Sequence, residues 1–106
     1  MSINSKAKGA KGERELAHIL QEYGFDAHRG RQYKGGSDSP DVTGIEGVHI
    51  ECKRVERLNI YDAMKQSIRD AGDDMPIVAH RKNGEKWLVT LRLPDFLKLY
   101  EGWKNA

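Results

Sequence analysis

The chain has 106 residues, of which 38% are hydrophobic and 32% are charged. This balance is typical of a folded globular protein and excludes an intrinsically disordered chain, while the length allows one core but not two. No apolar run is long enough to cross a bilayer, no signal peptide is recognisable at the start, and a single cysteine excludes an internal disulfide.

Charge is distributed unevenly along the chain. Residues 1–34 carry a net charge of +3, residues 35–75 a charge of −4, and residues 76–106 a charge of +3. This division can arise by chance on a solvated surface. It is also expected of a surface that binds a polyanion around a carboxylate cluster, and composition does not decide between the two interpretations. Residues 1–11 contain three lysines and no acid, which predicts a mobile basic arm in front of a single domain over residues 12–106.

A helix is predicted over residues 12–23, with Gly24 in the position that commonly ends a helix. Its apolar stripe follows helical spacing and consists of Leu16, Ile19, Leu20 and Tyr23. Glu15 points away from this stripe. Glu13 instead lies about 20° from Leu20 around the helix axis, which places a carboxylate on the face turned toward the core. There it could simply complement the helix dipole, or it could have a function.

The rest of the chain predicts five strands and two further helices. The strands span residues 25–29, 41–43, 48–54, 76–81 and 86–92, and the helices span residues 60–71 and a segment that starts near Pro94. Asn59 is the expected N-cap of the second helix, and Asn83-Gly84 is a strong hairpin turn. The order α-β-β-β-α-β-β-α predicts an α/β fold with a mixed five-stranded sheet flanked by helices.

Two carboxylates and a lysine come together in this arrangement. Asp41 and Glu51 flank a turn, so hairpin pairing would place them opposite each other, and Lys53 follows on the strand face of Glu51. Neighbouring carboxylates repel unless a cation or a proton lies between them, and oxygen ligands favour Mg²⁺, with Mn²⁺ as a substitute. The backbone carbonyl of Cys52 could be a further ligand, and Glu13 could hold the metal through water.

This set of groups suits hydrolysis of a phosphodiester. A metal lowers the pKa of a bound water and neutralises charge on the phosphate, and a nearby lysine can orient the water. Each element also has an ordinary structural interpretation, because a Glu-x-Lys triplet is commonly a solvated strand face and Pro-Asp is commonly a turn. The coincidence of both with an inward-facing Glu13 favours a nuclease.

Pro40-Asp41, followed after nine residues by Glu51-Cys52-Lys53, resembles the PD-(D/E)xK nuclease motif. The segments at residues 12–16, 23–25, 39–41 and 50–53 resemble the archaeal-type Holliday junction resolvases and their phage-encoded relatives. This resemblance implies a restriction-endonuclease-like fold and a homodimer that nicks opposite strands of a four-way DNA junction. It also implies a cytoplasmic location, in a prokaryotic cell or a phage-infected host, and no organic cofactor.

The resemblance also implies roles for individual residues. Those matching Glu13, Asp41, Glu51 and Lys53 form the metal site, and those matching Arg14 and Arg29 bind junction DNA. A serine of the family implicated in activity has Ser39 or Ser37 as its candidate here.

Further candidates come from the residues themselves. We expect Lys11 and Arg31 to contact DNA, Tyr33 to be able to stack on a base, and Gln66 to be a possible neighbour of the site. His49 shares the strand face of Glu51 and is expected to be a satisfied polar residue. Cys52 alternates inward and is expected to be a small buried hydrophobe. Four aromatic residues in the C-terminal part of the chain are expected to be core or dimer contacts, namely Trp87, Phe96, Tyr100 and Trp103.

Three functions remain in competition. The first is a metal-dependent, structure-selective endonuclease that resolves Holliday junctions. The second is a nuclease of the same fold that acts on flaps, forks or duplex DNA. The third is a non-catalytic DNA-binding module, against which the intact set of four site residues argues.

Overall fold

The computed structural model describes residues 5–30 and 40–106. Over these residues the chain forms the elements α1 (Ser5–Glu22), β1 (His28–Arg29), β2 (Val42–Thr43), β3 (Val48–Arg54), α2 (Ile60–Ala71), β4 (Met75–Arg81), β5 (Leu88–Leu91) and α3 (Leu93–Lys104). The predicted order of helices and strands is confirmed.

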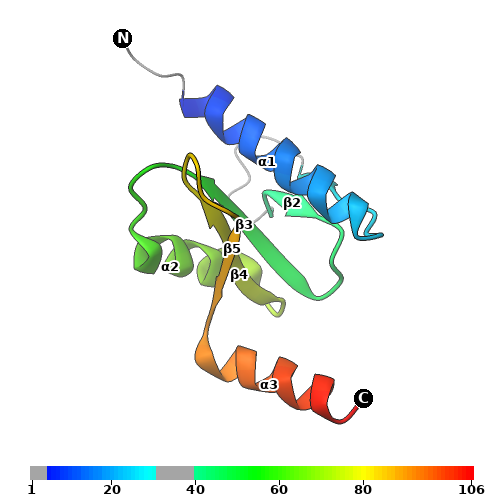
Figure 1. Ribbon diagram of the computed structural model, residues 1–106. Helices are drawn as coiled ribbons and strands as arrows, with labels where there is room; N and C mark the ends of the chain where they lie inside the picture. The colour runs from blue at the N-terminus through cyan, green and yellow to red at the C-terminus, as the bar shows by residue number, and fades with distance from the viewer. Residues whose placement is uncertain (1–4, 31–39) are drawn as a thin grey trace.

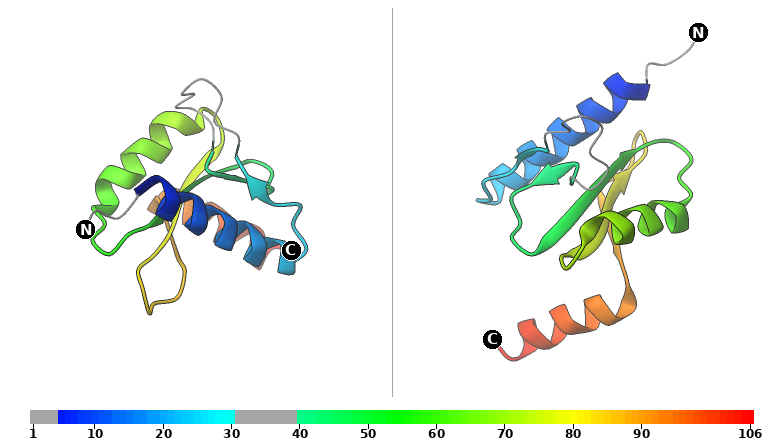
Figure 2. Two further views of the ribbon diagram at one scale, coloured as in Figure 1. Left: turned by 90° about the horizontal axis from the view of Figure 1, so that it is seen from above. Right: turned by 180° about the vertical axis from the view of Figure 1, so that it is seen from behind.

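The strands form one five-stranded sheet in the order β1-β2-β3-β4-β5. β3 and β4 are parallel and the other neighbouring pairs are antiparallel, so the sheet is mixed, as predicted. Because successive side chains of a strand point to opposite faces, the sheet has two cores. Ile50 packs with Leu16 of α1 on one face, and Val78 packs with Met64 of α2 on the other. Figures 1 and 2 show these two helices on opposite sides of the sheet.

The first helix begins at Ser5, before its predicted start at Gly12. Lysine and alanine are good helix formers, and they continue the helix into the segment predicted as a basic arm. Residues 1–4 of that segment lie outside the described residues, and its mobility stays a prediction. The helix ends as expected at Gly24, which has φ +97°. The Gly24 N–H donates to Gln21 O at 2.9 Å and the Phe25 N–H to Leu20 O at 3.1 Å, the bonds of a Schellman motif.

Some predicted faces and boundaries are wrong. Tyr23, expected in the apolar stripe of α1, is 79% exposed, and it follows Glu22, the last residue of the helix. In α2, Ile68 is 39% exposed, whereas Ser67 is buried because its hydroxyl donates to Ile77 O at 2.9 Å. β1 is shorter than the predicted strand over residues 25–29, since Phe25 completes the helix C-terminus.

The C-terminal helix α3 lies away from the sheet, to which β5 connects it (Figure 1). Pro94 lies in its first turn, as predicted. Large apolar side chains of α3 that are 44% to 74% exposed form what we term the α3 surface, namely Leu93, Phe96, Leu97, Leu99, Tyr100 and Trp103. Trp87 behaves differently and packs against the core. In the described part of the chain, no helix combines the length and the apolar character that crossing a membrane requires.

Candidate active site

The antiparallel pairing of β2 with β3 brings Asp41 and Glu51 together. Val42 pairs with Ile50, and the Asp41 N–H donates to Ile50 O at 2.9 Å. The same register places Asp41 opposite Glu51, and directly opposed residues of an antiparallel pair have neighbouring side chains. Both residues are buried, with Asp41 9% and Glu51 1% exposed. The juxtaposition expected from the turn is therefore present in the structure.

Glu51 is a buried carboxyl with one satisfied oxygen. Its Oε1 lies 2.9 Å from Nε2 of His49, whereas its Oε2 is buried with no hydrogen-bond partner among the residues that the structure describes. Burial, and then the neighbouring Asp41 carboxylate, raise the pKa of Glu51 to about 8. The side chain therefore holds a proton near neutral pH unless a cation compensates its charge. An unpartnered buried oxygen beside a second carboxylate is a fit for a divalent metal.

Asp41 is held in place by the backbone of β3. The Cys52 N–H donates to Asp41 Oδ2 at 2.9 Å, which fixes this carboxylate against the backbone of β3. The thiol of Cys52 is buried, as predicted. Its pKa is raised to about 12, mainly by burial and secondly by the negative charge of Asp41. The thiol stays neutral and serves as a small hydrophobe. The proposed role of the Cys52 carbonyl as a metal ligand stays a prediction.

Glu13 of α1 lies close enough to Asp41 for their charges to interact. Burial raises the pKa of Glu13, its bond from Arg29 lowers it, and the charge of Asp41 raises it further, with a net rise. The Arg29 Nε donates to Glu13 Oε1 at 3.0 Å. Within residues 5–30 and 40–106, no three His, Cys, Asp or Glu side chains are grouped as metal ligands. Glu13 therefore does not join Asp41 and Glu51 as a third direct ligand in this arrangement.

Lys53 lies beside the carboxylates and is positioned by α2. Its Nζ donates to Gln66 Oε1 at 3.1 Å, across the gap between β3 and the helix. Strand alternation places the side chain on the same face as Glu51. Gln66, which the sequence offered only as a possible neighbour, is thus in direct contact with a candidate site residue.

Sequence reasoning missed two contributions. Asp70 of α2 is buried, and its charge is among the causes that raise the pKa of Glu51, although no motif marks it. Glu15, expected to point away from the core, accepts bonds from Arg81 Nε at 2.7 Å and Trp87 Nε1 at 2.9 Å. That network ties α1 to β4 and to the segment before β5. Both interactions join segments that are separated in sequence, so no local pattern could have found them.

The candidate DNA-binding residues are placed only in part. Lys11 and Arg14 are exposed on α1, and Arg29 is partly exposed in β1. A Cβ atom on Gly12 would lie 2.8 Å from the Cβ of Arg54, so this part of α1 passes close to the end of β3. The remaining loop candidates lie outside the described residues, namely Arg31, Tyr33, Ser37 and Ser39.

Two of the comparisons with known proteins return matches. A family model described as archaeal Holliday junction resolvase (Hjc) matches residues 4–92, which reach from α1 to β5 and stop before α3. The structure is similar to that of Hjc from Archaeoglobus fulgidus, a Holliday junction resolvase of an archaeal hyperthermophile, with a TM-score of 0.58. The two sequences are 26% identical, and the alignment covers 79% of this chain and 72% of the other. A search of the curated proteins finds no match.

Proposed function

Because the chain belongs to the archaeal Holliday junction resolvase family, we propose that it is a metal-dependent endonuclease that resolves four-way DNA junctions by paired nicks. The observation that carries this proposal is the buried pair of Asp41 and Glu51 beside Lys53. Two buried carboxylates repel each other unless a proton or a cation lies between them, and a divalent cation would replace the proton that Glu51 holds near neutral pH.

Asp41 and Glu51 are the residues that would hold Mg²⁺, with Mn²⁺ as a substitute. Mg²⁺ commonly takes one or two carboxylates and completes its coordination with water and substrate phosphate, which suits a site with two protein carboxylates. When bound, the metal supplies an activated water and neutralises charge on the phosphate. Glu13, whose pKa is raised by the charge of Asp41, would accept hydrogen bonds from metal-bound water on the α1 side of the site.

The remaining side chains position the reacting groups. Lys53 Nζ, held by Gln66, donates a hydrogen bond to the attacking water or to a phosphate oxygen. His49 fixes the orientation of the Glu51 carboxyl through the bond to Oε1. Lys11, Arg14 and Arg29 supply positive charge for the DNA backbone without reading its sequence.

The α3 surface supports the proposal of a homodimer. Leu93, Phe96, Leu97 and Tyr100 follow the spacing i, i+3, i+4, i+7, so they share one face of the helix. These four side chains are each about half exposed or more, and together they leave on the order of 500 Å² of apolar surface accessible to solvent. This area approaches the roughly 800 Å² that each partner buries in a stable interface. Sedimentation at micromolar protein would contradict the paired-nick arrangement if it showed only monomer.

The test of the proposed function is cleavage of a labelled four-way junction and of a matched linear duplex, with Mg²⁺ and with EDTA. We expect symmetric nicks in the junction that require the metal. Glu51→Gln is expected to bind the junction without cutting it, and Glu46→Gln, which changes an exposed carboxylate in a turn, serves as the matched control.

The other outcomes assign different functions. Equal cutting of both substrates would keep the nuclease and replace the junction by duplex, flap or fork DNA. An absence of cutting with Mg²⁺ and with Mn²⁺, together with binding that falls steeply with salt, would indicate the non-catalytic DNA-binding module.

A further inference from the structure

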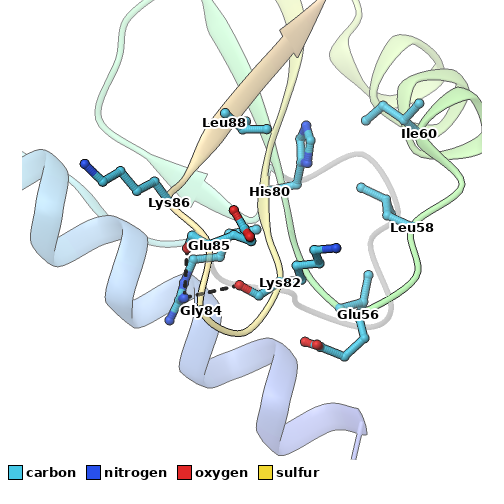
Figure 3. A pocket seen from close by; sticks show the side chains of 11 residues that line it. Glu56, Leu58, Ile60, His80, Lys82, Gly84, Glu85, Lys86 and Leu88 are labelled. Atoms are coloured by element: carbon cyan, nitrogen blue, oxygen red, sulfur yellow. Dashed lines mark hydrogen bonds between the residues drawn. The ribbon is translucent and has the colours of Figure 1, made fainter.

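A pocket of about 730 Å³ lies between residues 55–59 after β3 and the turn that joins β4 to β5 (Figure 3). Figure 3 shows His80 between Leu88 on one side and Leu58 and Ile60 on the other. Lys82 and Lys86 belong to the same lining and come from the turn. None of these residues takes part in the site built around Asp41 and Glu51.

The strand register connects this pocket with Lys53. Lys53 of β3 pairs with His80 of β4, which pairs in turn with Leu88 of β5. Paired residues of neighbouring strands point to the same face, and the strands are about 4.8 Å apart. The pocket therefore begins one strand spacing from Lys53. A DNA strand with its scissile phosphate at Lys53 would have a neighbouring nucleotide beside the pocket.

Hydrogen bonds hold the two walls of the pocket in place. The Asn83 N–H donates to Glu56 Oε2 at 2.8 Å and so joins the turn to the segment after β3. Inside the turn, Arg81 Nη1 donates to Glu85 O at 3.1 Å, and the same guanidinium is anchored on Glu15 of α1. A pocket whose walls are tied in this way needs little reorganisation to accept a ligand.

The lining suits a nucleotide. Leu58, Ile60 and Leu88 offer apolar contact for a flat ring, and the imidazole of His80 offers a surface on which a base can stack. Burial lowers the pKa of His80, so the ring is neutral at physiological pH, and its Nε2 is occupied by Thr90 Oγ1 at 2.9 Å. The lysines of the turn are suited to a phosphate.

We propose that this pocket receives an unpaired nucleobase from the DNA strand next to the scissile phosphate. The inference rests on the proposed nuclease function and deepens it, because it names what selects branched DNA. A base in continuous duplex must first be unpaired and unstacked to enter a pocket, whereas a base at the branch point of a junction can be displaced at lower cost.

The test uses Leu88→Trp, which fills the pocket from an exposed strand position. Val89→Trp is the matched control, because Val89 is the next residue of β5, points to the other face, and is 56% exposed against 60% for Leu88. We expect Leu88→Trp to weaken junction binding about tenfold, the loss of one stacked base, and Val89→Trp to bind as the original chain does. His80→Ala is a second pocket variant that adds no bulk, and it is expected to weaken binding in the same direction.

A direct readout comes from 2-aminopurine placed in turn at the nucleotides that flank the mapped cut, with the Glu51→Gln protein. We expect a change in fluorescence at one position, lost on adding Leu88→Trp and kept on adding Val89→Trp. The pocket proposal would be overturned if Leu88→Trp, His80→Ala and Val89→Trp all bound the junction as tightly as the original chain and no position showed a change in fluorescence. A protein that neither binds nor cuts the junction at all would instead overturn the proposed function.

Discussion

Replacing Glu51 by Gln should stabilise the metal-free protein, and the gain should grow with pH. The pKa of Glu51 rises from 4.5 to about 8 in the folded state, so the folded protein binds a proton there that the unfolded chain releases. Stability from this group is therefore complete below pH 4.5 and falls as the pH rises toward about 8. The glutamine side chain of the variant stays neutral and can keep the hydrogen bond to His49, so the variant avoids this loss.

The size of the effect follows from the shift. At about 1.4 kcal/mol per pKa unit, the full rise corresponds to about 5 kcal/mol, and we expect a gain of about 2 to 5 kcal/mol at pH 8.5. At pH 5 the two proteins should differ by less than about 1 kcal/mol. Comparing the variant with the original chain at each pH cancels the titration of groups that are common to both.

Urea unfolding in EDTA at pH 5 and pH 8.5 measures both quantities. A gain of 2 to 5 kcal/mol would raise the midpoint by roughly 1 M or more at the slopes usual for small domains. Mg²⁺ added at pH 8.5 should stabilise the original chain and have little effect on Glu51→Gln, since a ligand stabilises only the state that binds it. A difference that does not change with pH, or a variant less stable at pH 8.5, would refute the reasoning.

Three further substitutions test the neighbourhood of the site. Gln66→Ala removes the hydrogen bond that holds Lys53 Nζ, so it should slow junction cleavage by about 10- to 100-fold and leave junction binding unchanged. Single-turnover kinetics measure the cleavage rate, and a separate titration measures binding. Arg29→Ala should weaken junction binding and reduce the slope of log affinity against log salt by about 1. Glu15→Gln should lower the free energy of unfolding by about 1 to 3 kcal/mol at pH 7, because it weakens the charged bonds to Arg81.

Each of these has an outcome that would count against it. Unchanged cleavage by Gln66→Ala would mean that Lys53 needs no partner from α2. An unchanged salt slope for Arg29→Ala would place this side chain outside the phosphate contacts. The bond from Arg81 lowers the pKa of Glu15, so the stabilisation is present above pH 4.5 and is lost as the pH falls below that value. A Glu15→Gln effect that persisted undiminished at pH 3 would contradict this explanation.

Local sequence patterns predicted the elements of the fold. Asn59 caps α2 because its side-chain oxygen accepts the Asp62 N–H at 3.1 Å, and Gly24 ends α1 because it adopts positive φ at little cost. These signals depend on residues adjacent in the chain, so they can be read without knowing what packs against the element. The same holds for Asp41 opposite Glu51, because a short turn between two strands fixes their register.

Contacts between distant segments depend on the tertiary structure. The sequence alone determined the order of three helices and five strands, the mixed character of the sheet, and a carboxylate pair followed by a lysine. Only the folded structure decided that Glu51 is 1% exposed, that Gln66 holds Lys53, and that a pocket opens beside His80. The burial of Glu51 and the bond from Lys53 to Gln66 depend on how α2 packs on the sheet. The pocket depends on where the β4–β5 turn lies relative to the segment after β3. That geometry results from the packing of both cores together, and no stretch of neighbouring residues contains it.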